Sequence, residues 1–101
     1  MKILIIEDHP AQLKLAHHVL SAAGHDVSGA EAPEVALATI KRDRPQLILL
    51  DLLLPDVDGL TLVRSLKADP ETRDIHVVAV TSYPEHIPKH PPWPRGVTRT
   101  L

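Results

Sequence analysis

The chain is short, and its composition is that of one globular domain. It has 101 residues, of which 44% are apolar, a formal net charge of −2 and no cysteine. A chain of this length forms one domain, and without cysteine it has neither disulfides nor thiolate-bound metal. No apolar run is long enough to cross a bilayer, and the first residues contain too few apolar side chains for a secretory signal. We therefore expect a cytoplasmic protein that does not contact the membrane.

The chain changes character near residue 83. Residues 1–83 carry 12 acidic and 8 basic side chains, whereas residues 84–101 carry one acidic and three basic ones. Five of the ten prolines lie between Pro84 and Pro94, and this density of proline prevents a helix. The sequence thus predicts an incomplete domain over residues 1–83 and an atypical proline-rich tail over residues 84–101. The tail is more typical of a disordered linker than of a ligand for an aromatic groove.

Strands and helices alternate along residues 1–83. Short apolar runs bounded by turn residues indicate buried strands, and apolar residues at helical spacing, opened by proline or closed by glycine, indicate helices. In chain order we predict a strand at 3–6, a helix from Pro10 to a stop at Gly24 with Asp8 or His9 as its cap, a weaker strand at 25–30, a helix at 33–42, a strand at 47–50, a helix at 59–68 and a strand at 75–80. This alternation predicts a doubly wound parallel α/β sheet.

Polar side chains stand where three of these strands end. Glu7 and Asp8 follow the first strand, Asp51 follows the third and Thr81 follows the fourth. The carboxyl ends of parallel strands form the ligand-binding edge of such sheets, so we expect these groups to converge there. Carboxylates at one edge repel one another, by about 4 kcal/mol for two unit charges about 4 Å apart at an effective dielectric constant of about 20.

A bound cation would remove this repulsion. Because no histidine or cysteine is expected at ligand spacing, the carboxylate oxygens predict Mg²⁺, which keeps several waters and binds substrate phosphate. With the cation in place, one carboxylate can attack a phosphoryl group and form an aspartyl phosphate. Thr81 would then donate its hydroxyl to a phosphoryl oxygen. As plain structural alternatives, Asp8 would cap the first helix and Thr81 would end a strand.

These residues resemble the receiver domain of two-component response regulators, a domain of flavodoxin-like fold. The resemblance covers about residues 1–83. Four motifs carry it in the expected order, Ile3-Leu-Ile-Ile-Glu7-Asp8, Leu47-Ile-Leu-Leu-Asp51, Leu54-Pro55-Asp56-Val57-Asp58-Gly59 and Val77-Val-Ala-Val-Thr81-Ser82. Each motif alone is weak evidence, and the four together at the ends of the predicted strands are strong evidence.

The resemblance implies a role for each site residue. Asp51 would accept the phosphoryl group from a histidine kinase or a histidine phosphotransfer protein. Asp8, Asp51 and the backbone carbonyl of Leu53 would hold Mg²⁺, with Glu7 helping through water, and Thr81 would move toward the phosphoryl group. Any enzymatic activity would be limited to self-phosphorylation and self-dephosphorylation. With no DNA-binding segment in the sequence, the output would pass through protein contacts rather than nucleic acid.

The family pattern stops at Tyr83. The resemblance implies a further helix, a fifth strand ending in a lysine that binds the phosphoryl group, and a last helix, whereas Lys89 stands too close to Thr81 to be that lysine. We interpret the tail as a truncated, spliced or out-of-frame end, so the flavodoxin-like sheet is expected to be truncated after the fourth strand. The strand at 75–80 would then be an exposed apolar edge that allows a dimer or aggregation. Residues 97–101 have strand propensity and could cover that edge, in the same chain or in another.

Two other functions fit parts of the sequence. A receiver-like module that has lost phosphorylation would serve only as an interaction surface, and the missing lysine favours it. A phosphohydrolase of the haloacid-dehalogenase type is a remote alternative, because Asp56-Val57-Asp58-Gly59-Leu60-Thr61 resembles its signature. That signature must follow a strand directly, whereas Pro55 intervenes here, and Asp56 and Asp58 fit turn and cap residues better than ligands.

Overall fold

The protein folds as alternating strands and helices. The structure, a computed structural model, describes residues 1–51, 57–80 and 97–100, with the backbone alone for Pro33, Asp51, residues 57–60, Val80 and residues 97–100. The elements are β1 (Lys2–Ile6), α1 (Pro10–Ala22), β2 (Asp26–Ala30), α2 (Pro33–Asp43), β3 (Leu47–Asp51), α3 (Val57–Ala68), β4 (His76–Val80) and β5 (Val97–Thr100). The predicted order of elements is confirmed, and α3 begins two residues earlier than expected.

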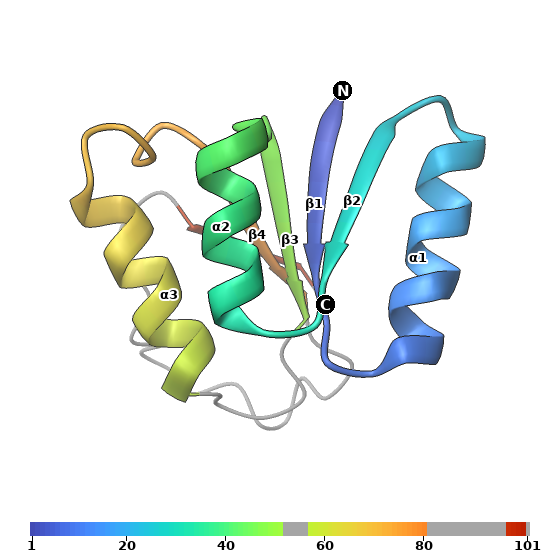
Figure 1. Cartoon of the computed structure of the whole chain (residues 1–101), viewed down its shortest axis with the longest axis horizontal. Coiled ribbons are helices and arrows are strands. Elements are labelled where there is room, and N and C mark those ends of the chain that lie inside the picture. Colours follow the sequence, from blue (N-terminus) through green and yellow to red (C-terminus); the bar gives the residue numbers. More distant parts are fainter. Residues whose placement is uncertain (52–56, 81–96, 101) are drawn as a thin grey trace.

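The strands form one parallel sheet in the order β2-β1-β3-β4-β5. Figure 1 shows α1 on one side of the sheet and α2 with α3 on the other. The chain runs outward from β1 to β2 and then crosses back to β3, so a topological switch point lies between β1 and β3. This arrangement confirms the predicted doubly wound, flavodoxin-like fold.

The outer edge of β4 is covered by β5. The two strands pair in parallel, with Val77 opposite Val97 and Val80 opposite Thr100. The sequence allowed two outcomes for this edge, exposure to solvent or cover by the last residues of the chain. In the structure, the last residues of the same chain cover it. The sheet therefore has a fifth strand where truncation after the fourth was expected.

The core lies between the sheet and the pair α2 and α3. Alternate residues of each central strand point to this side, as the period of two in a strand requires. The core cluster consists of Leu4, Ile6, Ala30, Ala36, Ile40, Ile48, Leu50, Leu62, Val63, Leu66, Val77 and Ala79. Ile3 and Ile5, which alternate with Leu4 and Ile6, are also buried. The apolar run of β1 is thus buried on both faces, as predicted for a strand inside a parallel sheet.

Helix ends follow the local signals in the sequence. Pro10 and Pro33 stand in the first turns of α1 and α2, where the missing N–H of proline costs nothing. Gly24, with φ of +94°, follows the end of α1, and Arg44, with φ of +48°, ends α2. Of the two caps predicted for α1, the N-cap is His9, and its side chain makes no capping hydrogen bond.

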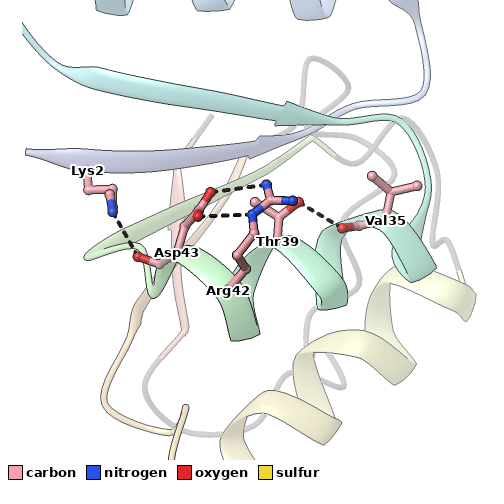
Figure 2. A network of polar contacts seen from close by, with 5 residues as sticks. All are labelled: Lys2, Val35, Thr39, Arg42 and Asp43. Atoms are coloured by element: carbon pink, nitrogen blue, oxygen red, sulfur yellow. Dashed lines mark hydrogen bonds and ion pairs between the residues drawn. The ribbon is translucent and has the colours of Figure 1, made fainter.

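Polar contacts attach the end of α2 to the start of β1 (Figure 2). The Nζ atom of Lys2 donates to the backbone carbonyl of Asp43 at 3.0 Å, and the guanidinium of Arg42 donates to both carboxylate oxygens of Asp43 at 3.1 and 3.3 Å. One helical turn apart, Thr39 Oγ1 donates to the carbonyl of Val35 at 2.9 Å. The bond from Lys2 satisfies a backbone carbonyl at the end of α2, where helical N–H partners run out. No helix in the described part of the chain has the length and hydropathy that crossing a membrane requires.

Candidate functional site

The ends of β1, β3 and β4 bring the predicted site residues to one edge of the sheet. Ile6, the last residue of β1, pairs with Leu50 of β3, so Glu7 and Asp51 are the next residues along these neighbouring strands. Asp51 ends β3 and pairs with Val80, the last residue of β4. The backbone thus places Glu7, Asp8 and Asp51 at the edge where ligands bind in parallel sheets. Leu53 and Thr81 lie outside the described residues.

Glu7 is a charged residue in a buried place. Its side chain is only 4% exposed, and its backbone N–H donates to the carbonyl of Ala30 at 3.0 Å, which extends the pairing of β1 with β2 by one residue. A buried carboxylate is costly unless it is hydrogen-bonded. Here Glu7 Oε1 accepts a bond from the backbone N–H of His9 at 2.9 Å, so the turn after β1 stabilises the charge.

His9 completes a group of three side chains that we call the acidic–histidine cluster, Glu7, Asp8 and His9. Its Nδ1 lies 3.1 Å from Glu7 Oε1 and 3.0 Å from Asp8 Oδ1. The hydrogen bond to Glu7 raises the pKa of His9 above its ordinary value, burial opposes this shift, and the negative charges of Asp8 and Glu7 add to the rise.

The expectation that no histidine stands at ligand spacing is wrong, because His9 directly follows the two acids. Three successive residues in the turn after β1 bring their side chains together there. The available signal was the uninterrupted sequence Glu7-Asp8-His9 at the end of a predicted strand. Asp8 is not the cap of α1, because the N-cap is His9. The Asp8 side chain is 75% exposed.

The donor atoms of this cluster suit a divalent cation. One ligand atom from each of Glu7, Asp8 and His9 can be chosen so that all three lie within 4.8 Å of one another. Carboxylate oxygens are the ligands of hard ions such as Mg²⁺, and the neighbouring end of β3 adds Asp51 to the same edge. The chemistry of the donor set therefore fits the ion that the sequence predicted.

The fold and its edge define a class of protein: a doubly wound parallel α/β domain with acidic residues at the topological switch point between β1 and β3. The profile of the response regulator receiver domain family matches residues 3–89. The chain belongs to this family, whose members act in two-component signal transduction.

Similar proteins of known identity agree with this assignment. The response regulator PleD of Caulobacter vibrioides is 43% identical over 81 residues, which are 80% of this chain and 18% of PleD. The polar-differentiation response regulator DivK of Brucella anthropi is 37% identical over 81 residues, which are 66% of DivK. The chain thus spans under a fifth of the length of PleD.

Solved receiver structures have the same fold. The N-terminal domain of a response regulator receiver protein from Methanoculleus marisnigri JR1 superposes with a TM-score of 0.72 at 31% identity, covering 83% of this chain and 71% of that one. The response regulator TrrA from Thermotoga maritima, in complex with Mg²⁺-BeF, gives 0.71 at 27% identity, with 84% and 73% covered. The Mn²⁺-bound form of the response regulator Rcp1 gives 0.67 at 30% identity, with 81% and 66% covered.

The family match also bears on the phosphohydrolase alternative. That alternative depended on Asp56, which lies outside the described residues, and on the segment after it, which forms the start of α3 at Val57. The receiver domain profile includes these residues in its match to residues 3–89. The receiver assignment is therefore the one on which the functional proposal is built.

Proposed function

We propose that this domain accepts a phosphoryl group on Asp51, in an Mg²⁺-dependent transfer from a histidine kinase or a histidine phosphotransfer protein. One observation carries the proposal. The register of β1 and β3 sets Asp51 beside Glu7, with Asp8 next in the chain, at the carboxyl edge of the sheet. Family membership and the Mg²⁺-BeF complex of TrrA support it.

The site residues would share three tasks. Asp8, Asp51 and the backbone carbonyl of Leu53 would hold Mg²⁺, with Glu7 helping through water, and the bound ion would offset the negative charge that collects around a phosphoryl group. Asp51 would supply the carboxylate oxygen that forms the new P–O bond. The P–N bond to the donor histidine would break, and its electron pair would leave with the nitrogen. Thr81 would donate its hydroxyl to a phosphoryl oxygen.

Burial of Glu7 supports a fixed site at this edge. A carboxylate held by the His9 backbone N–H at 2.9 Å is already positioned before any ligand arrives. Asp8 is exposed and can turn toward an ion without disturbing the core. In this arrangement the protein supplies position and charge, which is most of what phosphoryl transfer requires.

Labelling with a small acyl phosphate tests the proposal. The whole chain is incubated with the donor and Mg²⁺, and intact mass is measured. We expect the mass of one phosphoryl group to be added, and to be absent in Asp51→Asn or after chelation of Mg²⁺. Asp74→Asn is the matched control, because this exposed acid precedes β4 at the opposite edge of the sheet.

Two outcomes would contradict the proposal. A folded, Mg²⁺-binding chain that takes up no phosphoryl group would point to the interaction module without phosphorylation. Uptake that persists in Asp51→Asn would show that another residue is the acceptor.

A further inference from the structure

We propose that His9 is a specificity-determining ligand of this site, and that its imidazole raises the affinity for a divalent first-row transition ion relative to Mg²⁺. The inference rests on the proposed function, because it concerns the ion that Glu7, Asp8 and Asp51 would hold.

The distances within the acidic–histidine cluster match the coordination geometry of such an ion. Ligand atoms about 2.0–2.2 Å from a six-coordinate ion lie about 3 Å apart when they are adjacent, and somewhat over 4 Å apart when opposite. His9 Nδ1 lies 3.1 Å from Glu7 Oε1 and 3.0 Å from Asp8 Oδ1, and the three ligand atoms fall within 4.8 Å of one another. The two separations from His9 Nδ1 are therefore those of adjacent ligands around one ion.

The backbone holds His9 in place. Its N–H donates to the same Glu7 oxygen that faces its ring, at 2.9 Å. Pro10 follows at the start of α1, and the proline ring restricts the backbone there. Because a positioned ligand loses little freedom when an ion binds, this histidine is a better ligand than a mobile surface one.

The two kinds of ion differ in their preference for an imidazole ligand. Mg²⁺ prefers oxygen ligands and gives up its waters reluctantly, whereas imidazole is a good ligand for first-row transition ions. The ring contacts both carboxylates, so an ion that takes only oxygen ligands would have to displace it from them. A transition ion would instead keep the ring through the Nδ1 lone pair. The His9 side chain is 51% exposed, which leaves it room to turn away when Mg²⁺ binds.

Metal titrations of His9→Gln test this inference with two ions. Calorimetry on the whole chain at one fixed pH gives the dissociation constants for Co²⁺ and Mg²⁺. We expect the variant to bind Co²⁺ about tenfold or more weakly, and Mg²⁺ equally well or more tightly. His18→Gln, an exposed histidine of α1 outside the cluster, is the matched control and should change neither constant. In the Mn²⁺-loaded chain, pulsed electron paramagnetic resonance should detect a coordinated imidazole nitrogen that His9→Gln loses.

The outcomes separate this inference from the proposed function. Equal changes in the Co²⁺ and Mg²⁺ constants, or a nitrogen signal that survives in His9→Gln, would overturn the role of His9, since a purely structural effect moves both ions together. Phosphoryl uptake with an unchanged ratio of constants would refute this inference alone. A shifted ratio in a chain that takes up no phosphoryl group would leave this inference standing and refute only the proposed acceptor role.

Discussion

At the scale of single residues, Glu7 shows how a buried charge is made tolerable. It accepts a backbone hydrogen bond from His9 and lies within 3.1 Å of the same imidazole. Hydrogen bonds from donors lower the free-energy cost of burying a carboxylate. The turn after β1 therefore supplies, within three residues, both the acids of the site and the donor groups that hold one of them.

Asp43 offers a residue-scale prediction that concerns pH. The hydrogen bonds from Arg42 are the main reason that the pKa of Asp43 is lowered, burial opposes them, and the charges of Arg42 and Lys2 lower the pKa further. We expect Arg42→Met to raise the pKa of this carboxyl toward its ordinary value. Carbon-13 NMR titration of the carboxyl group measures it directly, and Lys41→Met removes a nearby exposed charge as a control.

The direction of the stability effect follows from the lowered pKa of Asp43. A carboxyl group whose pKa is lowered in the folded state contributes stability above its ordinary pKa and loses that contribution as the pH falls through the lowered pKa. The Arg42→Met variant should thus begin to unfold at a higher pH than the unchanged protein during acid titration. An Asp43 pKa unaffected by Arg42→Met would contradict the role given to this pair.

At the scale of elements, the connection from α3 to β4 depends on one hydroxyl. The carbonyl of Leu66 would ordinarily accept from the N–H four residues later, but that residue is Pro70, which has none. Thr72 Oγ1 donates to Leu66 instead, at 2.7 Å, in a buried place. Lys67 donates to the carbonyls of Arg73 and Ile75 at 3.0 and 2.8 Å. In this connection, side-chain donors therefore satisfy three backbone carbonyls.

We expect Thr72→Val to lower the free energy of unfolding by about 1–3 kcal/mol, because it leaves a buried carbonyl without this donor. Thr39→Val is the matched control. Thr39 Oγ1 also donates to a carbonyl, that of Val35, but inside a helix that carbonyl keeps its regular backbone bond. Urea unfolding of both variants measures the difference, and equal losses would show that the hydroxyl of Thr72 has no special part.

In helix α1, the spacing of apolar residues predicts which side chains face the sheet but not how deeply they are buried. Of the apolar residues that recur at helical spacing in this part of the sequence, Leu13, Ala16 and Leu20 are half-buried and Ala23 is exposed, and no residue of α1 is fully buried. Leu15 and Val19 are exposed. In Figure 1, α1 is the one labelled helix on its side of the sheet, whereas α2 and α3 share the other. The extent of burial depends on neighbours, which the spacing within one helix does not contain.

At the scale of the whole molecule, β5 changes what the sheet presents at its outer edge. An apolar strand with a free edge invites pairing with another chain, and β5 covers the edge of β4. The new edge strand has only four residues, including Arg99, and short edges with a charge resist further pairing. Pairing with a second chain is therefore not needed to cover the edge of the fourth strand.

We therefore expect the whole chain to be monomeric and a variant lacking residues 97–101 to self-associate. The shortened chain should also lose at least about 1 kcal/mol of stability, which lowers the melting temperature by about 4–8 °C in a domain of this size. Analytical ultracentrifugation and thermal unfolding measure both effects. Replacing residues 97–101 by glycine and serine keeps the length and should behave like the deletion, whereas a monomeric, equally stable variant would show that β5 contributes little.

The sequence by itself determined the order of elements, the buried central strands and the acidic edge, because these follow from the spacing of neighbouring residues and from the geometry of parallel sheets. It also carried the family motifs that the profile match confirms. Only the tertiary structure decided that His9 turns back onto Glu7 and Asp8, that β5 pairs with β4 of its own chain, and that α1 is half-buried. These outcomes depend on the path of the backbone in a turn and on which surfaces pack together. The spacing of apolar residues along the chain contains neither kind of information.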